Sequence, residues 1–358
     1  MVKASRRHLA EAGIGLVLGA IAIAAIISCI VTFMPHQQTY PYIPVSDEIS
    51  LPSGSYSPGV ADTPGSKITS IPVVSWHQMD NGCQATAAEC TTPKFSADNV
   101  TQRQFYDEIS WLYSHGYRTI TSSQYVEWAT GKSVMLPAKP ILLTVDDGIA
   151  NFYAGATPVL QHFGYTMVSM VVSGFAQGAQ DGDRQYKGWD ATWTQLNNLP
   201  SGTWEFAFHA GPQGHLTTTG AGANDCPYFY PCQHPGESAS AYEARVQKDV
   251  DAGIAAEQQN LGSRVDTSMW AVPFNDLAQS PDEPQSGQTP QTWLNDYAAK
   301  KFAVVFVDGY TSRENQHYRY EVHGTDSLAF FASQIQRADV FTRLPNAATA
   351  TARAGGQS

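Results

Sequence analysis

Strand-like and helix-like segments alternate along most of the chain, and this order limits the folds open to it more than any other feature. Apolar runs of strand length are followed by segments whose apolar residues recur at helical spacing. Repeated strand-then-helix order produces a parallel sheet with helices outside, so we predict a closed or nearly closed α/β barrel. The predicted strands are 71–76, 118–121, 140–145, 167–172, 204–208, 269–272 and 303–307, and the predicted helices are 101–115, 123–130, 154–162, 192–199, 241–261 and 291–300.

An uncharged stretch, residues 13–34, follows a short basic segment, residues 1–12. It is long enough to cross a bilayer, because about 20 apolar residues suffice. The positive charges before it place the N-terminus in the cytoplasm and the rest of the chain outside. We therefore predict an uncleaved signal-anchor that crosses the cell membrane once. The alternatives are a cleaved signal peptide, which would give a secreted protein, and a lipid anchor at Cys29.

Composition divides the remainder of the chain. Residues 35–67 are rich in Pro, Ser and Gly and lack periodicity, which is typical of a linker. Residues 346–358 are small and polar, and we predict a disordered tail. One domain, residues 68–345, lies between these segments. The formal net charge of −11 argues against a nucleic-acid partner.

Four cysteines follow the predicted anchor: Cys83, Cys90, Cys226 and Cys232. An even number in an extracytoplasmic segment predicts two disulfides, and three connectivities are open. The short separations favour Cys83–Cys90 and Cys226–Cys232. A zinc cluster is disfavoured because neither pair has two intervening residues.

Two adjacent carboxylates, Asp146 and Asp147, end the apolar strand of residues 140–145 and precede Gly148. Placing two negative charges side by side is unfavourable unless a cation or a proton is shared there. Taken alone, the triplet also suits a turn with glycine at positive φ. In a barrel, however, active sites lie at the carboxyl ends of the strands, which is where both aspartates fall.

Two histidines follow another predicted strand, with His209 at its end and His215 six residues later. Each alone suits a structural role, but together with the aspartates they form a hydrolase pattern. We predict that Asp147, His209 and His215 bind one divalent transition metal, with zinc favoured, and leave a fourth position for water. Asp146 would then act as general base in hydrolysis of an amide or an ester.

With these aspartates and histidines, the chain resembles the polysaccharide deacetylases, carbohydrate esterase family 4. Its segment Thr144-Val145-Asp146-Asp147-Gly148 is similar to the T-F-D-D-G motif of that family. The resemblance implies that Asp146 is the base, that Asp147 is a metal ligand and that His209 and His215 are the histidine pair. It covers most of residues 71–335 and is closest to the branch that deacetylates poly-β-1,6-N-acetylglucosamine in biofilm synthesis. The fold it implies is a distorted (β/α)7 barrel.

The same branch has a first strand that ends in an aromatic residue and histidine, similar to Trp76-His77 here. This implies that His77 is the general acid that protonates the leaving amine, and a histidine suits this role because it titrates near neutral pH. Two alternatives stay open: His77 stacks under Trp76, or His323 is the acid.

Residues 271–275 resemble a later motif of the family. This resemblance implies that Pro273, Phe274 and Asn275 line the sugar pocket. Asn275 stands where the family has glycine, and no arginine stands just before the motif. The segment 216–236 resembles an insertion near the site.

The spacing of the histidine pair also departs from the family pattern. Five residues separate His209 from His215, one or two more than is usual, and Val145 replaces the phenylalanine of the aspartate motif. For the second histidine ligand, His234 and His317 are therefore alternatives to His215.

These observations predict a membrane-anchored, zinc-dependent N-deacetylase acting on an N-acetylglucosamine polysaccharide outside the cell. Peptidoglycan is the alternative polymer, and an O-acetyl esterase is a more distant reading. The altered histidine spacing also motivates a non-catalytic module that binds polysaccharide without turnover. A further partner hypothesis is an exopolysaccharide synthase complex reached through the anchor.

Overall fold

The computed structural model describes residues 50–53, 56, 59–80, 98–216, 229–275, 290–307, 315–338 and 340–341. All of them lie in the compact unit of residues 43–358. Among these residues, every helix is too short or too polar to span a lipid bilayer. The predicted anchor over 13–34, the alternative lipid site at Cys29 and the predicted tail over 346–358 lie outside the described residues.

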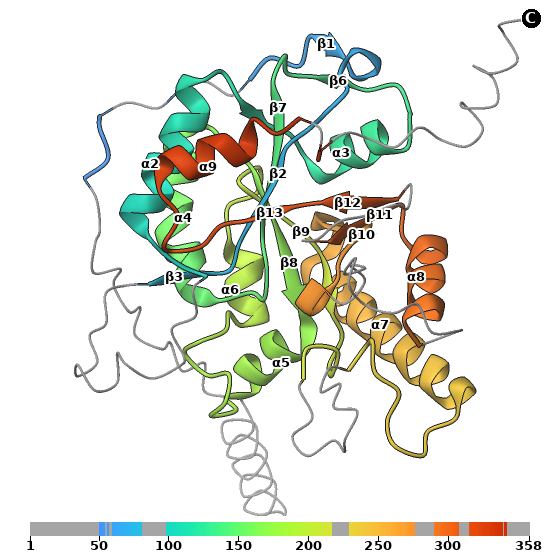
Figure 1. Cartoon of the computed structure of the whole chain (residues 1–358). Helices are drawn as coiled ribbons and strands as arrows, with labels where there is room; N and C mark the ends of the chain where they lie inside the picture. Colours follow the sequence, from blue (N-terminus) through green and yellow to red (C-terminus); the bar gives the residue numbers. More distant parts are fainter. Residues whose placement is uncertain are drawn as a thin grey trace, which may run out of the picture. The chain divides into compact units, whose positions relative to one another are not determined.

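Among the described residues, nine parallel strands form one sheet that curves into a nearly closed barrel (Figure 1). Along the sheet the order is β12-β11-β10-β9-β8-β7-β2-β13, and β5 pairs with the start of β7. The predicted α/β barrel is therefore confirmed. The strands are β2 (Val73–Trp76), β5 (Arg118–Thr119), β7 (Pro140–Val145), β8 (Met167–Val172), β9 (Trp204–Ala210), β10 (Val265–Ala271), β11 (Val304–Val307), β12 (Gln316–Tyr318) and β13 (Tyr320–Glu321).

One short segment, residues 316–321, joins the two edges of this sheet. Its first half, β12, pairs with β11, and its second half, β13, pairs with β2. The backbone N–H of Arg319, which lies between the two strands, donates to the carbonyl of Val307 at 2.9 Å. The N–H of Val322 donates to the carbonyl of Ser75 at 2.9 Å. We call residues 316–321 the closing segment, because it supplies strands to both edges of the barrel.

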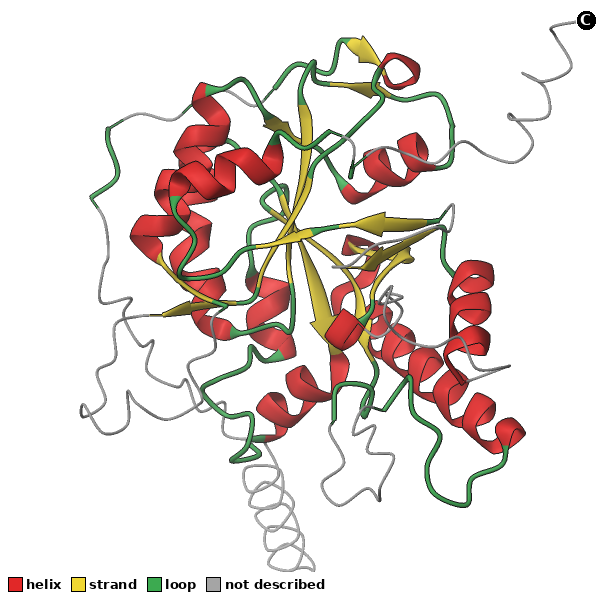
Figure 2. Cartoon of the chain, viewed as in Figure 1, coloured by secondary structure: helices red, strands yellow, loops and turns green. Residues whose placement is uncertain are grey.

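Helices cover the outside of the barrel on two sides (Figures 1 and 2). One apolar cluster joins the strands to α2, α4, α6 and α9, and a second cluster joins them to α7 and α8. These helices bury one apolar stripe each, as expected for amphipathic surface helices. Their bounds are α2 (Gln102–Ser114), α4 (Ala150–Phe163), α5 (Ser173–Asp181), α6 (Trp193–Asn198), α7 (Ala239–Leu261), α8 (Pro290–Lys301) and α9 (Leu328–Ile335).

The interior of the barrel is filled by side chains, and one end is covered by α3 (Ser122–Ala129). Tyr125 and Trp128 of this helix belong to the same apolar cluster as the inward-facing residues of the strands. The N–H of Ser122 donates to Glu205 Oε2 at 2.7 Å, near the beginning of β9. The helix therefore closes the end at which the strands begin, and the carboxyl ends of the strands remain for a functional site.

The remaining short elements lie at the edges of the barrel. β1 (Thr63–Pro64) pairs with β6 (Met135–Leu136), and η1 (Gly65–Lys67) follows it. β1 and η1 fall within residues 35–67, the range predicted as a linker, and the structure packs them onto the domain. β3 (Gln78–Asp80) pairs with β4 (Asn99–Thr101), η2 covers Gly262–Arg264 and η3 covers Pro273–Asn275.

Candidate metal centre

The aspartate pair follows directly from the end of β7. The N–H of Asp146 donates to the carbonyl of Trp76 at 2.9 Å, which continues the ladder between β7 and β2. The chain then turns sharply: Asp147 has φ 71° and Gly148 has φ 92°. Aspartate tolerates this left-handed conformation better than most residues because its short side chain can bond locally. The turn sends the two carboxylates to different partners.

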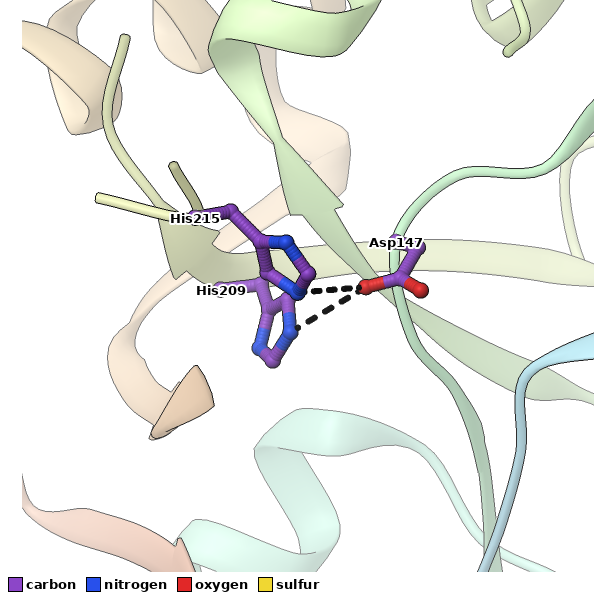
Figure 3. A group of neighbouring side chains, drawn as sticks. All are labelled: Asp147, His209 and His215. Carbon is purple, nitrogen blue, oxygen red and sulfur yellow. Dashed lines mark ion pairs between the residues drawn. The ribbon is translucent and has the colours of Figure 1, made fainter. Parts of the chain in front are cut away.

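Asp147 faces two imidazole rings from the end of β9 and the loop after it (Figure 3). Its Oδ1 lies 3.0 Å from Nε2 of His215 and 3.4 Å from Nε2 of His209. One potential ligand atom from each of the three residues lies within 4.8 Å of the other two. Among the described residues, His209 and His215 are the two histidines close enough to Asp147 to bind the same metal ion.

The ring of His209 is oriented by a bond on its far side. Its Nδ1 lies 2.6 Å from the carbonyl oxygen of Ala271 in β10. A carbonyl only accepts, so Nδ1 carries the hydrogen and Nε2 presents its lone pair toward Asp147. A histidine that ligates a metal through one nitrogen and donates from the other has this arrangement.

The loop that carries His215 is fixed by a hydrogen-bonded chain leading into α7. The hydroxyl of Tyr230 accepts from the N–H of Gly211 and donates to Asp249 Oδ2, both at 2.9 Å. Oδ1 of the same carboxylate accepts from the N–H of Gln213 at 2.8 Å. A Cβ at Gly214 would collide with the Tyr230 ring, so the loop can pass only as glycine there. The longer histidine spacing is therefore accommodated by a dedicated support.

Aromatic rings enclose the side chain of His215. Its centroid lies 5.1 Å from Phe175 of α5 and 4.4 Å from Phe274 of η3. Phe274 has φ 57° and is 41% exposed, so a large part of this residue is open to solvent beside the histidine. Of the three residues expected to line a sugar pocket, Pro273 is buried, Phe274 borders the site, and the side chain of Asn275 lies outside the described part of the structure.

The donor set fits a transition metal. Asp147 Oδ1 is buried and lacks a hydrogen-bond partner among the described residues, while two nitrogens converge on it. Burial alone would raise the pKa of Asp147, but the neighbouring His215 charge and the contacts with both rings hold it well below its usual value. One ionised carboxylate and two imidazoles are a common three-ligand set for catalytic zinc.

Asp146 makes a different contact, with an arginine that sequence reasoning missed. Both of its oxygens lie 2.7 Å from the guanidinium nitrogens of Arg319, and both side chains are 1% exposed. Burial alone would raise the pKa of Asp146, but the charge of Arg319 lowers it below the usual value. Arg319 lies in the closing segment, 173 residues from Asp146 along the chain.

His77 lies between two carboxylates at the end of β2. Its Nε2 is 3.7 Å from Asp146 Oδ2, and its Nδ1 is 3.4 Å from Glu321 Oε1 in β13. Burial would lower the pKa of His77, but the charges of Asp146, Asp147 and Glu321 raise it above the usual value. The three carboxylates therefore stabilise the protonated ring, which is the form that can donate a proton.

The two alternatives for His77 receive less support from the geometry. The Trp76 side chain points to the helical layer, where its Nε1 donates to Glu108 Oε2 at 3.0 Å and its ring meets Phe105. His323 is 40% exposed, and its Nδ1 bonds Asp98 Oδ1 at 2.9 Å rather than the aspartate pair.

The substitutes named for the second histidine ligand lie elsewhere. His317 Nδ1 bonds the hydroxyl of Tyr125 at 3.0 Å, next to the helix that covers the other end of the barrel. The backbone of His234 bonds Glu237, and its ring lies near Phe229. One more acid was missed by sequence reasoning: burial, together with the charge of Asp147, raises the pKa of Asp190 to about 8.

Comparisons with known proteins agree with this geometry. No family model matches the chain. Curated relatives in Escherichia coli, strains K12 and O157:H7, are named poly-β-1,6-N-acetyl-D-glucosamine N-deacetylase and are 26% identical over 194 residues. The matched region covers 49% of this chain but 27% of each relative. The chain thus corresponds to about a quarter of the length of these proteins.

Solved structures extend the likeness to most of the chain. A de-N-acetylase from Aggregatibacter actinomycetemcomitans matches with a TM-score of 0.58 at 18% identity, over 74% of this chain and 99% of that one. IcaB from Ammonifex degensii matches with a TM-score of 0.52 at 21% identity, over 75% and 97%. The BpsB deacetylase domain from Bordetella bronchiseptica matches with a TM-score of 0.50 at 20% identity, over 74% and 97%. The resemblance to the polysaccharide deacetylases is confirmed, and the chain has their fold.

Proposed function

We propose that this chain is a metal-dependent N-deacetylase that removes acetyl groups from N-acetylglucosamine residues of an extracellular or cell-envelope polysaccharide. The observation that carries the proposal is the convergence of Asp147, His209 and His215 beside a second carboxylate, Asp146, held separately by Arg319. The name of the Escherichia coli relatives supports this substrate class. Peptidoglycan is the alternative polymer.

Asp147, His209 and His215 would hold the metal, with zinc favoured by the two nitrogen ligands and one oxygen ligand. When bound, zinc lowers the pKa of a coordinated water to about 7 and polarises a substrate carbonyl. The orientation of His209 by Ala271 and the support of the His215 loop by Tyr230 keep both Nε2 atoms in position before any ligand arrives.

The chain itself supplies two acid–base groups, Asp146 and His77, which lie 3.7 Å apart. Asp146 accepts the proton of the attacking water, and Arg319 keeps its carboxylate ionised and fixed by two bonds. His77 donates a proton to the leaving amine nitrogen, and Glu321 favours the charged ring that can do so. The partly exposed side chain of Phe274 offers an apolar surface for a sugar ring beside the proposed metal ligands.

The proposal is tested by measuring acetate release from β-1,6-linked N-acetylglucosamine oligomers by the purified full chain. We expect release with zinc present, loss of release after chelation, and recovery when zinc is restored. Turnover that survives exhaustive chelation would contradict the metal mechanism. Release from peptidoglycan but not from the oligomers would select the alternative polymer. Retention on either polymer without release from either would support the non-catalytic module.

The two candidate acids are separated by a matched pair of substitutions. We expect His77→Gln to lower kcat by about 10²–10⁴-fold, because the leaving amine loses its proton donor. His323→Gln should change kcat less than about twofold at one zinc per chain, because its ring bonds Asp98 and lies outside the proposed mechanism. Equal losses in both variants, or a loss confined to His323→Gln, would overturn this assignment.

We further propose that the domain works outside the cytoplasm, held by the predicted anchor over 13–34. The support on the structural side is Cys232, which is disulfide-bonded, since disulfides form in oxidising compartments. Cys83, Cys90 and Cys226 lie outside the described residues, so the pairing Cys226–Cys232 stays a prediction. The exopolysaccharide synthase complex stays a proposal of the same kind.

A further inference from the structure

A second group of ligand-type side chains lies next to the acid side of the candidate site. It consists of Asp98, just before β4, Glu321, at the end of β13, and His323, two residues later. One potential ligand atom from each lies within 4.8 Å of the other two, and Asp98 Oδ1 is 2.9 Å from His323 Nδ1. The proposed deacetylation uses Glu321 only as the partner of His77 and does not use the other two residues.

The backbone that carries His323 is fixed from two sides. Its N–H donates to Asp326 Oδ2 at 3.0 Å, and the same oxygen accepts from the hydroxyl of Tyr320 at 2.6 Å. Its carbonyl accepts from Gln104 Nε2 of α2 at 2.9 Å. The imidazole is therefore carried by a fixed backbone and lies close to two carboxylates from separate parts of the chain, as in a preformed ligand cluster.

We propose that Asp98, Glu321 and His323 bind a second divalent transition-metal cation, such as zinc, and that this cation inhibits the enzyme. Two carboxylate oxygens and one imidazole nitrogen are ligands that zinc accepts. All three side chains are partly exposed, so a cation can reach them without opening the barrel. The three side chains of this cluster are 27–40% exposed, whereas those of Asp147, His209 and His215 are 3–16% exposed, so we expect the second site to bind its cation more weakly than the first.

The inhibition follows from the shared carboxylate. Glu321 Oε1 lies 3.4 Å from Nδ1 of His77, and that nitrogen is buried without a hydrogen bond among the described residues. A cation that ligates Glu321 draws its carboxylate toward Asp98 and His323. His77 then loses the partner that holds its ring, and protonation of the leaving amine slows. This second step rests on the proposed deacetylase function, whereas cation binding does not.

The binding step is tested by equilibrium dialysis of the full chain against zinc, with the bound metal counted by mass spectrometry. We expect His323→Gln and Asp98→Asn each to bind one zinc fewer per chain than the wild type. Asp147→Asn should lose the tighter zinc and keep the weaker one. The control is His115→Gln, an exposed histidine at the end of α2 that bonds the carbonyl of Trp111. Unchanged stoichiometry in both cluster variants would overturn the proposal.

The inhibition step is tested by acetate release as zinc is raised beyond one equivalent. We expect wild-type activity to rise and then fall by roughly tenfold, part of the contribution that acid catalysis makes. His323→Gln should rise to the same maximum and stay there. A fall of equal size in His323→Gln would refute inhibition through this cluster. If no form of the chain releases acetate while the stoichiometries differ as expected, the deacetylase proposal fails and the second site stands.

Discussion

Asp146→Asn is expected to lower kcat for acetate release by about 10³-fold, within the range that general acid–base catalysis contributes. Asparagine keeps the size of the side chain and can still accept a bond from Arg319, but it cannot take a proton from water. Because Asp147, His209 and His215 are untouched, the chain should keep its bound zinc. The measurement is kcat together with metal content on the same preparation.

The matched control for this variant is Asp181→Asn in α5. Asp181 is exposed, and within the described part of the chain it accepts a surface bond from Gln177 Nε2 at 2.9 Å. We expect its kcat and zinc content to stay at wild-type values. Loss of zinc in Asp146→Asn would show that Asp146 is a ligand rather than the base, and unchanged kcat would remove it from the mechanism.

Arg319→Met is expected to damage stability and activity together. The guanidinium makes two 2.7 Å bonds to Asp146 where both groups are 1% exposed. Removing one partner of a buried ion pair leaves an uncompensated charge and costs about 3–5 kcal/mol of unfolding free energy. Without Arg319, burial is opposed only by the charges of His209 and His77, so the pKa of Asp146 rises and the acid limb of the pH–rate profile should move to higher pH.

A second substitution separates the buried charge from other effects. In Asp146→Asn/Arg319→Met no unpaired charge remains, so we expect part of the lost unfolding free energy to return although activity does not. Arg337→Met, at an exposed arginine after α9, is the control and should change stability by less than about 0.5 kcal/mol. Additive losses in the double variant would contradict the coupling. Denaturant unfolding and pH–rate profiles supply both readouts.

The sequence predicts most of the barrel because its central strands are continuous apolar runs. β7 and β8 have the predicted bounds, since every residue in them is buried. Helix α4 begins at Ala150, four residues earlier than predicted, because Ile149 gives no side-chain cap that marks a start. Strand β10 begins at Val265 rather than 269, because its first four residues are only partly buried and carry no apolar run.

Other elements are hidden because their sequences resemble different structures. The closing segment reads Gln-His-Tyr-Arg-Tyr-Glu, a polar run typical of a surface loop, yet Arg319 and Tyr320 are buried. Helix α5 follows β8 without a loop and contains Gly174 and Gly178, which weaken any helical prediction. Gly174 is required there, because a Cβ would collide with the backbone of Pro212.

Some residues of the candidate site could be predicted from the sequence, and others could not. The aspartate pair and the histidines could be found because they follow predicted strands at short spacing, and the structure brings Asp147, His209 and His215 together. Arg319 could not be found, since it meets Asp146 across 173 residues and carries no local signal. The sequence around Tyr230 and Asp249 likewise carries no pattern that indicates their support of the His215 loop. The roles of all these residues stay predictions until the variants are measured.

The closing segment also sets an order of events during synthesis. β7 and β9, which present Asp147 and His209, leave the ribosome well before Arg319 and Glu321 do. A nascent chain can therefore bring Asp147, His209 and His215 together while Asp146 still lacks the Arg319 guanidinium and His77 the Glu321 carboxylate. Only docking of residues 316–321 against both β11 and β2 supplies the two missing groups. If the proposed roles of Asp146 and His77 hold, a partly made or partly folded chain would lack deacetylase activity until these last strands have docked.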